Sequence, residues 1–289
     1  MTTDPNDIKL KLADGSRVQI ARQGAHILGW QTSGGVEQLY LSPKTARDGH
    51  TAIRGGVPIC FPQFNQRALG DTPCPKHGFA RNLPWKLESK ESLSKQAQAT
   101  FTLGDSEETR AQWPYAFQAG LQVRLAPGQL SIKFAVTNTD EQPWSCALAL
   151  HSYFRVDDIA KTYLTGLHQQ SYWDAVLNPQ DMQASSVQTE ADLHITGNVD
   201  RVYTAPGANM SLHKGRAGHQ LNISQSKSLS EVVVWNPGKD LCAQLADMPA
   251  DGYQQMLCVE AGRINQPVTL APGAQWSGWQ AFSLPKNKA

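Results

Sequence analysis

Hydrophobic and polar positions alternate with a period of two along many short segments of this chain. The clearest of these segments are residues 118–125, 130–137, 145–151, 231–235 and 256–260. Turn signals that contain glycine, such as Pro127-Gly128 and Pro237-Gly238, recur between them. Successive side chains of a β-strand point to opposite faces, so this pattern predicts half-buried strands joined by short turns, which is typical of antiparallel sheets.

Helical periodicity is rare along the chain. A short helix is predicted at residues 105–112, because acidic residues come early in this run and Pro114 closes it. Residues 270–284 predict a final hairpin packed onto the sheet. Its aromatic residues Trp276, Trp279 and Phe282 are expected in the core or at its rim, and the alternative is that one of them stacks on a sugar. We therefore expect an all-β fold, a large antiparallel β-sandwich with a few short helices.

Length and composition limit the function classes. No linker or shift of composition divides the 289 residues, so we expect one domain over residues 1–289. The net charge of +1, without a basic run, predicts no nucleic-acid partner. The N-terminal segment lacks a signal-peptide pattern, and no apolar run approaches the ~20 residues of a membrane span. A cytoplasmic protein with no membrane partner is expected, and a monomer is the default.

Cysteine and histidine spacing predicts neither a disulfide framework nor a metal site. The five cysteines are an odd number without a Cys-x-x-Cys pair, so they are expected to be reduced, buried small hydrophobes. Cys74, in a proline-rich loop, is expected to be a partly exposed free thiol. No ligand spacing relates the histidines His26, His50, His168, His194, His213 and His219.

Residues 53–81 form a cationic loop rich in glycine and proline. Gly55 and Gly56 allow close backbone approach or a positive φ, and the prolines stiffen what lies between. The cations are two arginines and a lysine: Arg54, Lys76 and Arg81. Guanidinium groups suit phosphate or carboxylate, so this loop predicts an anion site. The alternative is a surface loop whose arginines pair with distant acids.

His151 ends an alternating strand whose other residues show two different faces. One face carries large apolar side chains and is expected in the core, while the other carries Ser145, Ala147, Ala149 and His151. Small residues leave space, as the floor of a cleft would. A histidine on this floor could exchange a proton near neutral pH. The alternative is a strand-end histidine bonded to solvent or backbone.

Two acidic residues are candidates for the same cleft. Glu260 ends a strand that is apolar on both faces, and partial burial there would raise its pKa and favour a role as a base. The alternative is a glutamate capped by Arg263 at the sheet edge. Asp200 opens a strand after a turn, and by itself it is better explained as a turn residue or a partner of Arg201.

Taken together, these segments resemble the glucose-6-phosphate 1-epimerase family, the hexose-6-phosphate mutarotases, within the aldose 1-epimerase superfamily. The matching segments follow the family's order over nearly the whole chain: residues 53–58, 61–62, 77–81, 151–154, 200–203, 259–262 and 270–273. The resemblance implies a galactose mutarotase-like supersandwich that binds its sugar in a cleft on a concave sheet face.

The resemblance also implies roles for individual residues. His151 matches the family's acid and Glu260 its base, while Asp200 matches the carboxylate that holds sugar hydroxyls. Arg54 and Arg81 match the phosphate-binding arginines. Two further residues, Lys76 and His77, precede Arg81. Lys76 stands where relatives can have glutamine, and its charge still suits a phosphate. His77 either faces the ligand or braces the loop.

The implied reaction interconverts the α and β anomers of a hexose 6-phosphate, with glucose 6-phosphate the expected substrate. A base removes the C1 hydroxyl proton while an acid protonates the ring oxygen, so one carboxylate and one imidazolium suffice and no cofactor is expected. Three alternatives stay open: a mutarotase of unphosphorylated aldoses, a glycoside hydrolase that uses Asp200 and Glu260, and a non-catalytic sugar-phosphate binding protein.

Overall fold

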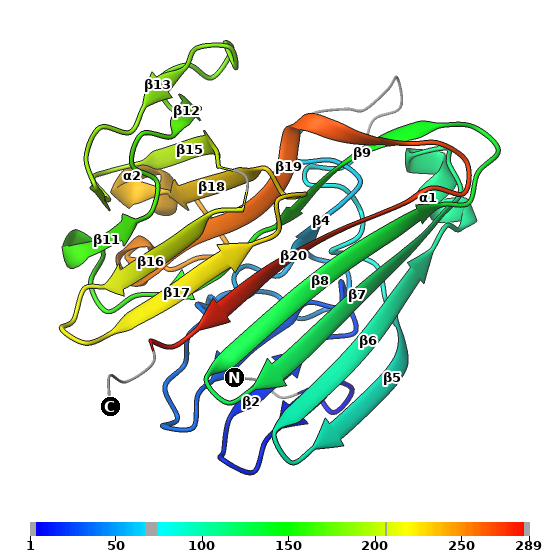
Figure 1. Ribbon diagram of the computed structural model, residues 1–289, viewed down its shortest axis with the longest axis horizontal. Coiled ribbons are helices and arrows are strands. Elements are labelled where there is room, and N and C mark those ends of the chain that lie inside the picture. Colours follow the sequence, from blue (N-terminus) through cyan, green and yellow to red (C-terminus); the bar gives the residue numbers. More distant parts are fainter. Residues whose placement is uncertain (1–3, 67–73, 206, 286–289) are drawn as a thin grey trace.

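The computed structural model describes residues 4–66, 74–205 and 207–285, and Figure 1 shows the arrangement of its strands. The chain forms three sheets whose strands pair antiparallel. The predicted all-β, antiparallel fold is confirmed. Each of the five alternating segments lies on an observed strand, although His151 falls one residue beyond the end of its own.

The smallest sheet holds the first three strands in sequence order. They are β1 (Ile8–Lys11), β2 (Arg17–Ile20) and β3 (Ile27–Gln31). The eight-stranded sheet has, in spatial order, β13 (Ser186–Val187), β12 (Ser171–Asp174), β15 (Val199–Thr204), β18 (Glu231–Asn236), β19 (Met256–Leu270), β9 (Trp144–Leu150) and β4 (Ile59–Cys60), with β10 (Tyr153–Arg155) pairing β19.

The nine-stranded sheet provides the second large layer. Its spatial order is β14 (Asp192–His194), β11 (Thr162–Thr165), β16 (Asn209–Lys214), β17 (Gln220–Gln225), β20 (Gln275–Ser283), β8 (Gln129–Asn138), β7 (Phe117–Ala126), β6 (Gln96–Gly104) and β5 (Lys86–Leu93). In Figure 1 it faces the viewer, with β19, β9 and β4 behind it. One buried apolar cluster draws on all three sheets, for example Leu10, Phe134 and Val259.

Helices are short in the part of the chain that the structure describes. They are α1 (Glu107–Gln112), α2 (Gly238–Cys242), and the 3₁₀ turns η1 (Ile159–Lys161) and η2 (Gly252–Gln255). The predicted helix at 105–112 is confirmed as α1, which begins after Ser106, whose hydroxyl accepts the N–H of Thr109 as an N-cap. None of these helices, within the ranges given above, has the length and apolarity needed to cross a bilayer.

The predicted final hairpin is wrong. β19 and β20 follow each other through a tight turn at residues 271–274, but β19 belongs to the eight-stranded sheet and β20 pairs with β8 and β17 of the other sheet. The turn thus crosses between layers. Phe282 is fully buried and Trp276 packs against the core, while Trp279 is partly exposed. Period-two patterning identifies strands but does not say which neighbour each one pairs with.

Two adjacent glycines bring the cationic loop against the core. Gly55 and Gly56 have φ values of 112° and 62°, and a Cβ atom would lie 2.4 Å from Tyr40 O at the first and 2.1 Å from Ile27 O at the second. The Gly56 N–H donates to Tyr40 O. Behind the loop, the buried imidazole of His26 lies 2.7 Å from Gly55 O, and burial lowers the pKa of His26 to about 3. The close backbone approach and the positive φ that the sequence allowed at Gly55 and Gly56 are therefore both present.

We predict that Gly56→Ala lowers the free energy of unfolding by at least about 2 kcal/mol, because the new methyl group meets backbone atoms that cannot move aside. Urea unfolding of both proteins gives the difference. Gly34→Ala is the matched control: nothing lies within 4 Å of its added Cβ, so the change should stay within about 0.5 kcal/mol. Equal stability of wild type and Gly56→Ala would contradict the close approach.

Candidate active site

The strand register brings His151 and Glu260 together. In the ladder between β19 and β9, Ala261 lies opposite Leu150, so the next step places Glu260 opposite His151. His151 Nε2 lies 3.3 Å from Glu260 Oε1, and the two residues are 7% and 1% exposed. Two groups 109 positions apart in the sequence therefore form one buried pair.

The sequence suggested that Glu260 ends its strand, but the structure shows that the strand continues beyond it. β19 continues to Leu270, and its register with β9 is irregular between Arg263 and Val268. The alternative of a glutamate at a sheet edge is therefore wrong, since β19 lies between β18 and β9. The Arg263 guanidinium instead donates to Ser230 Oγ over 2.9 Å.

The two predicted faces of the His151 strand are present, but one expectation about them is wrong. Trp144, Cys146, Leu148 and Leu150 lie in the main core, as expected. Ala147 and Ala149 are also buried, in a second apolar cluster with Cys60, Phe64 and Trp173. They are therefore packed rather than open, and the accessible space begins at His151.

Burial and neighbouring charges shift both members of the pair towards their neutral forms. Desolvation, and then the charge of Asp200, raise the pKa of Glu260 well above its usual value. Desolvation, followed by Arg54 and Arg81, lowers the pKa of His151 well below its usual value. Both shifts favour the form in which the carboxyl group carries the proton and the imidazole is neutral.

Both members of the pair also keep an unused polar atom. His151 Nδ1 and Glu260 Oε2 are buried and have no hydrogen-bond partner in residues 4–66, 74–205 and 207–285. Buried polar atoms without partners are unfavourable in a folded protein. These two atoms are thus available to the hydroxyl groups of a ligand.

The cationic loop and His151 line one pocket of about 120 Å³. Its lining includes four of the predicted binding residues, Arg54, Lys76, His77 and Arg81, together with His151. Arg81 donates from Nη2 to the carbonyl of Lys76 over 2.7 Å. Its Nε is buried, without an acceptor among the residues whose positions are given. A buried guanidinium N–H that lacks an acceptor favours binding of an anion.

Arg54 is already engaged by an acid. Its Nε lies 3.0 Å from Asp247 Oδ2, and its Nη1 donates to the hydroxyl of Tyr153 over 3.1 Å. The alternative that the loop arginines pair with distant acids therefore holds for Arg54. Neither partner of Arg54 was predicted from the sequence. The position of Tyr153, two residues beyond His151, is the signal that identifies it, whereas nothing in the sequence marks Asp247.

His77 braces the loop and also faces the pocket. It has a φ of 65°, and its Nδ1 accepts the N–H of Asn65 over 3.2 Å, so its proton must lie on Nε2. Desolvation, followed by the charges of His151 and Arg81, lowers its pKa far below the usual value. His77 is therefore a neutral hydrogen-bond donor and not a second acid.

Asp200 lies on the same sheet face as the pair, two strands away. It stands opposite Trp235 of β18, which in turn stands opposite Cys258 of β19. The adjacent Arg201 forms an ion pair with Asp174 at 3.1 Å. The charge of Asp200 contributes to the raised pKa of Glu260, so the two carboxyl groups interact electrostatically.

Aromatic rings surround the imidazole, and they differ from those that the sequence suggested. The ring of Tyr153 stacks on His151 at 4.7 Å and 10°, while Trp235 and Phe64 lie at 6.2 and 6.5 Å. Cys258 brings its sulfur within 4.8 Å of the ligating atoms of His151 and Glu260, an arrangement that could hold a metal ion. Burial raises the pKa of Cys258, which opposes the thiolate that a metal requires.

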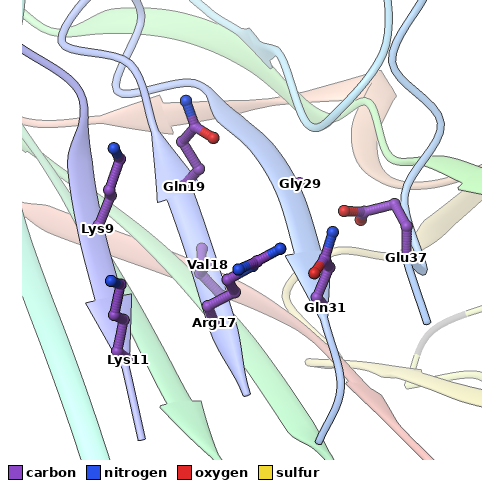
Figure 2. Close-up of a pocket in the computed structure, with 8 residues that line it drawn as sticks. All are labelled: Lys9, Lys11, Arg17, Val18, Gln19, Gly29, Gln31 and Glu37. Carbon is purple, nitrogen blue, oxygen red and sulfur yellow. The ribbon is translucent and has the colours of Figure 1, made fainter. Parts of the chain in front are cut away.

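Figure 2 shows a different hollow, of about 250 Å³, on the outer face of the smallest sheet. Lys9, Lys11 and Arg17 line it, as does Glu37, whose carboxylate accepts the backbone N–H groups of Trp30, Gln38 and Leu39. All three of these bonds go to Glu37 Oε1, and the lining residues include no imidazole. The hollow provides surface cations for control variants.

Comparison with known proteins finds relatives over nearly the whole chain. A family model described as aldose 1-epimerase matches residues 6–283. A protein of Salmonella typhimurium named as a candidate glucose-6-phosphate 1-epimerase is 36% identical over 271 residues, which cover 91% of this chain and 85% of that protein. A similarly named protein of Cenchrus ciliaris is 31% identical over 290 residues, which cover 96% of this chain and 85% of that protein. The crystal structure of a candidate mutarotase from Salmonella typhimurium has a TM-score of 0.85 and 31% identity, covering 99% of this chain and 96% of that one.

We predict that Glu260→Gln becomes progressively more stable than wild type as the pH rises above 4.5. Because the folded protein keeps the Glu260 proton that the unfolded chain releases near 4.5, the wild-type free energy of unfolding falls until the raised folded-state pKa is passed. The amide in the variant does not titrate. Urea unfolding of both proteins from pH 4.5 to 8 measures the difference, and a constant difference would contradict the raised pKa.

Proposed function

This chain belongs to the aldose 1-epimerase family and is an epimerase, and from that premise we propose that it interconverts the α and β anomers of a hexose 6-phosphate, with glucose 6-phosphate as its substrate. One observation carries the proposal: a buried carboxyl–imidazole pair, 3.3 Å apart, adjoins a pocket lined by Arg54, Lys76 and Arg81. The pair supplies proton transfer, and the cations supply a place for the phosphate.

In the proposed reaction, Glu260 removes the proton of the C1 hydroxyl while His151 protonates the ring oxygen. The ring opens to an aldehyde, rotation about C1–C2 exchanges its faces, and closure reverses both transfers. Each transfer contributes roughly 10²–10⁴-fold to the rate. Ring opening in effect moves one proton from His151 to Glu260 by way of the sugar, and ring closure moves it back, so the pair returns to its starting state after each turnover.

The phosphate would also prepare the pair for this reaction. Ligand-free, the charges of Arg54 and Arg81 help to keep the His151 imidazole neutral. A bound dianion offsets these charges, so it raises the pKa of His151 and favours the imidazolium–carboxylate form that the reaction needs. The remote phosphate then contributes to proton transfer as well as to positioning.

The remaining candidate residues hold the sugar. His77 donates from Nε2, Lys76 adds an exposed charge at the pocket mouth, and Asp200 accepts from sugar hydroxyls across the sheet face. The decisive assay follows freshly dissolved α-glucose 6-phosphate by polarimetry or NMR, with glucose and an aryl glycoside as comparison substrates. Equilibration no faster than the spontaneous rate would overturn the proposal, and release of the aryl group would indicate hydrolysis instead.

We predict that Glu260→Gln lowers kcat at least about 10²-fold, because an amide cannot accept the C1 hydroxyl proton. The affinity for glucose 6-phosphate, measured by calorimetry, should change little, since the amide keeps the size of the side chain. Retained turnover would remove Glu260 from the role of base.

We predict that Arg54→Ala raises KM for glucose 6-phosphate about tenfold or more while changing KM for glucose much less, because a charged hydrogen bond to phosphate is lost. Arg17→Ala, in the hollow of Figure 2, is the matched control and should leave both values unchanged. An equal effect of Arg54→Ala on the two sugars would show that Arg54 does not bind the phosphate.

A further inference from the structure

A continuous set of contacts joins the cation pocket to the imidazole. Asp247 binds Nε of Arg54, Nη1 of Arg54 donates to the hydroxyl of Tyr153, and the Tyr153 ring stacks on His151. His151 in turn contacts Glu260. Both ends of the candidate site are thus linked through a single tyrosine.

The backbone holds this tyrosine firmly. Tyr153 stands opposite Cys258 in the ladder between β10 and β19, its N–H donates to Gly56 O, and its carbonyl accepts the N–H of Tyr40. It is 2% exposed, and burial raises the pKa of its hydroxyl, which stays protonated. Its ring therefore has a fixed place, and the contact most open to change is the hydrogen bond from Arg54.

We propose that Tyr153 is a positioning residue that couples the binding of phosphate in the pocket beside Arg54 to the charge state and orientation of His151. This inference rests on the proposed function. The physical basis is the stack of the two rings. An imidazolium 4.7 Å from the face of a tyrosine ring gains a cation–π interaction that neutral imidazole lacks.

Arg54 controls the strength of that interaction. Its N–H bond to the tyrosine oxygen draws electron density from the ring, so the ring attracts a cation less strongly while the bond is intact. A phosphate dianion that binds the guanidinium competes with the tyrosine oxygen for its donors. Binding therefore restores the ring's attraction for the imidazolium at the moment when the acid is needed.

Asp247 sets the starting position of Arg54. Its carbonyl accepts the hydroxyl of Ser42 over 2.6 Å, which anchors the carboxylate opposite Nε of Arg54. With Nε held by this ion pair, Nη1 donates to the hydroxyl of Tyr153, and Arg54 lines the pocket. Asp247→Asn keeps a hydrogen-bond acceptor there, whereas Asp247→Ala releases the guanidinium.

A kinetic test compares Tyr153→Phe, which keeps the ring and removes only the hydroxyl, with Arg54→Ala and the double variant. We expect Tyr153→Phe to raise kcat for glucose roughly 2- to 5-fold, because the ring no longer loses electron density to the Arg54 hydrogen bond, and to change kcat for glucose 6-phosphate less than twofold, because bound phosphate already displaces that bond in wild type. In the double variant the tyrosine substitution should add nothing to Arg54→Ala. Equal effects on both sugars, or fully additive effects, would overturn the coupling.

A binding test does not depend on turnover. Inorganic phosphate is titrated into ¹⁵N-histidine-labelled protein, and the ring resonances of His151 are followed by NMR. The Tyr163–His213 stack, at 4.2 Å and 8° on β11 and β16 of the other large sheet, is the comparison pair with similar ring geometry.

We expect phosphate to shift His151 towards its protonated form in wild type, and to do so at least twofold less at saturation in Tyr153→Phe. An equal response in both proteins would overturn the inference even if mutarotation is confirmed. A response that needs the Tyr153 hydroxyl, in a protein that fails to accelerate mutarotation, would support the coupling and reject the proposed reaction.

Discussion

The site depends on one constraint, the register between β19 and β9. A one-residue slip of either strand would move its side chain to the opposite face of the sheet, so Glu260 and His151 meet only in the observed pairing. The register is fixed by apolar residues of both strands, such as Leu150 and Val259, which point into the main core. Packing of the core thereby determines the position of the proton-transfer groups on the other face.

The same burial that orders the pair also opposes its charged form. Desolvation acts on Glu260 and on His151 in opposite senses, and both effects favour neutrality. Asp200 strengthens the effect on the carboxyl, and the cations of the loop strengthen it on the imidazole. A sugar that lacks a phosphate leaves the cations' effect on the His151 pKa unchanged, whereas a dianion would offset it. Electrostatics can therefore separate two substrates that present the same reacting atoms.

The sequence predicts the parts of this site better than their assembly. Period-two alternation placed His151 and the residues before it on the correct faces, because side-chain direction is a local property of a strand. The same pattern failed for residues 270–284, where the turn connects two sheets. It also failed for Ala147 and Ala149, since the segment that covers them lies far away in the sequence. Asp247 could not be found, because its contact with Arg54 spans 193 positions.

The loop residues and the sheet residues of the site differ in backbone conformation. The sheet residues Glu260 and His151 lie in or beside extended strands, where the ladder holds them. The loop residues Gly55, Gly56 and His77 all have positive φ, a conformation that is unfavourable for histidine and that the tight contacts with the core maintain. Folding supplies the free energy that this unfavourable backbone conformation costs. The cations near the loop therefore do not have to be ordered when an anion binds. In the proposed reaction, a preordered cation pocket would let the phosphate act on the carboxyl–imidazole pair, which a flexible loop with the same charges would do only weakly.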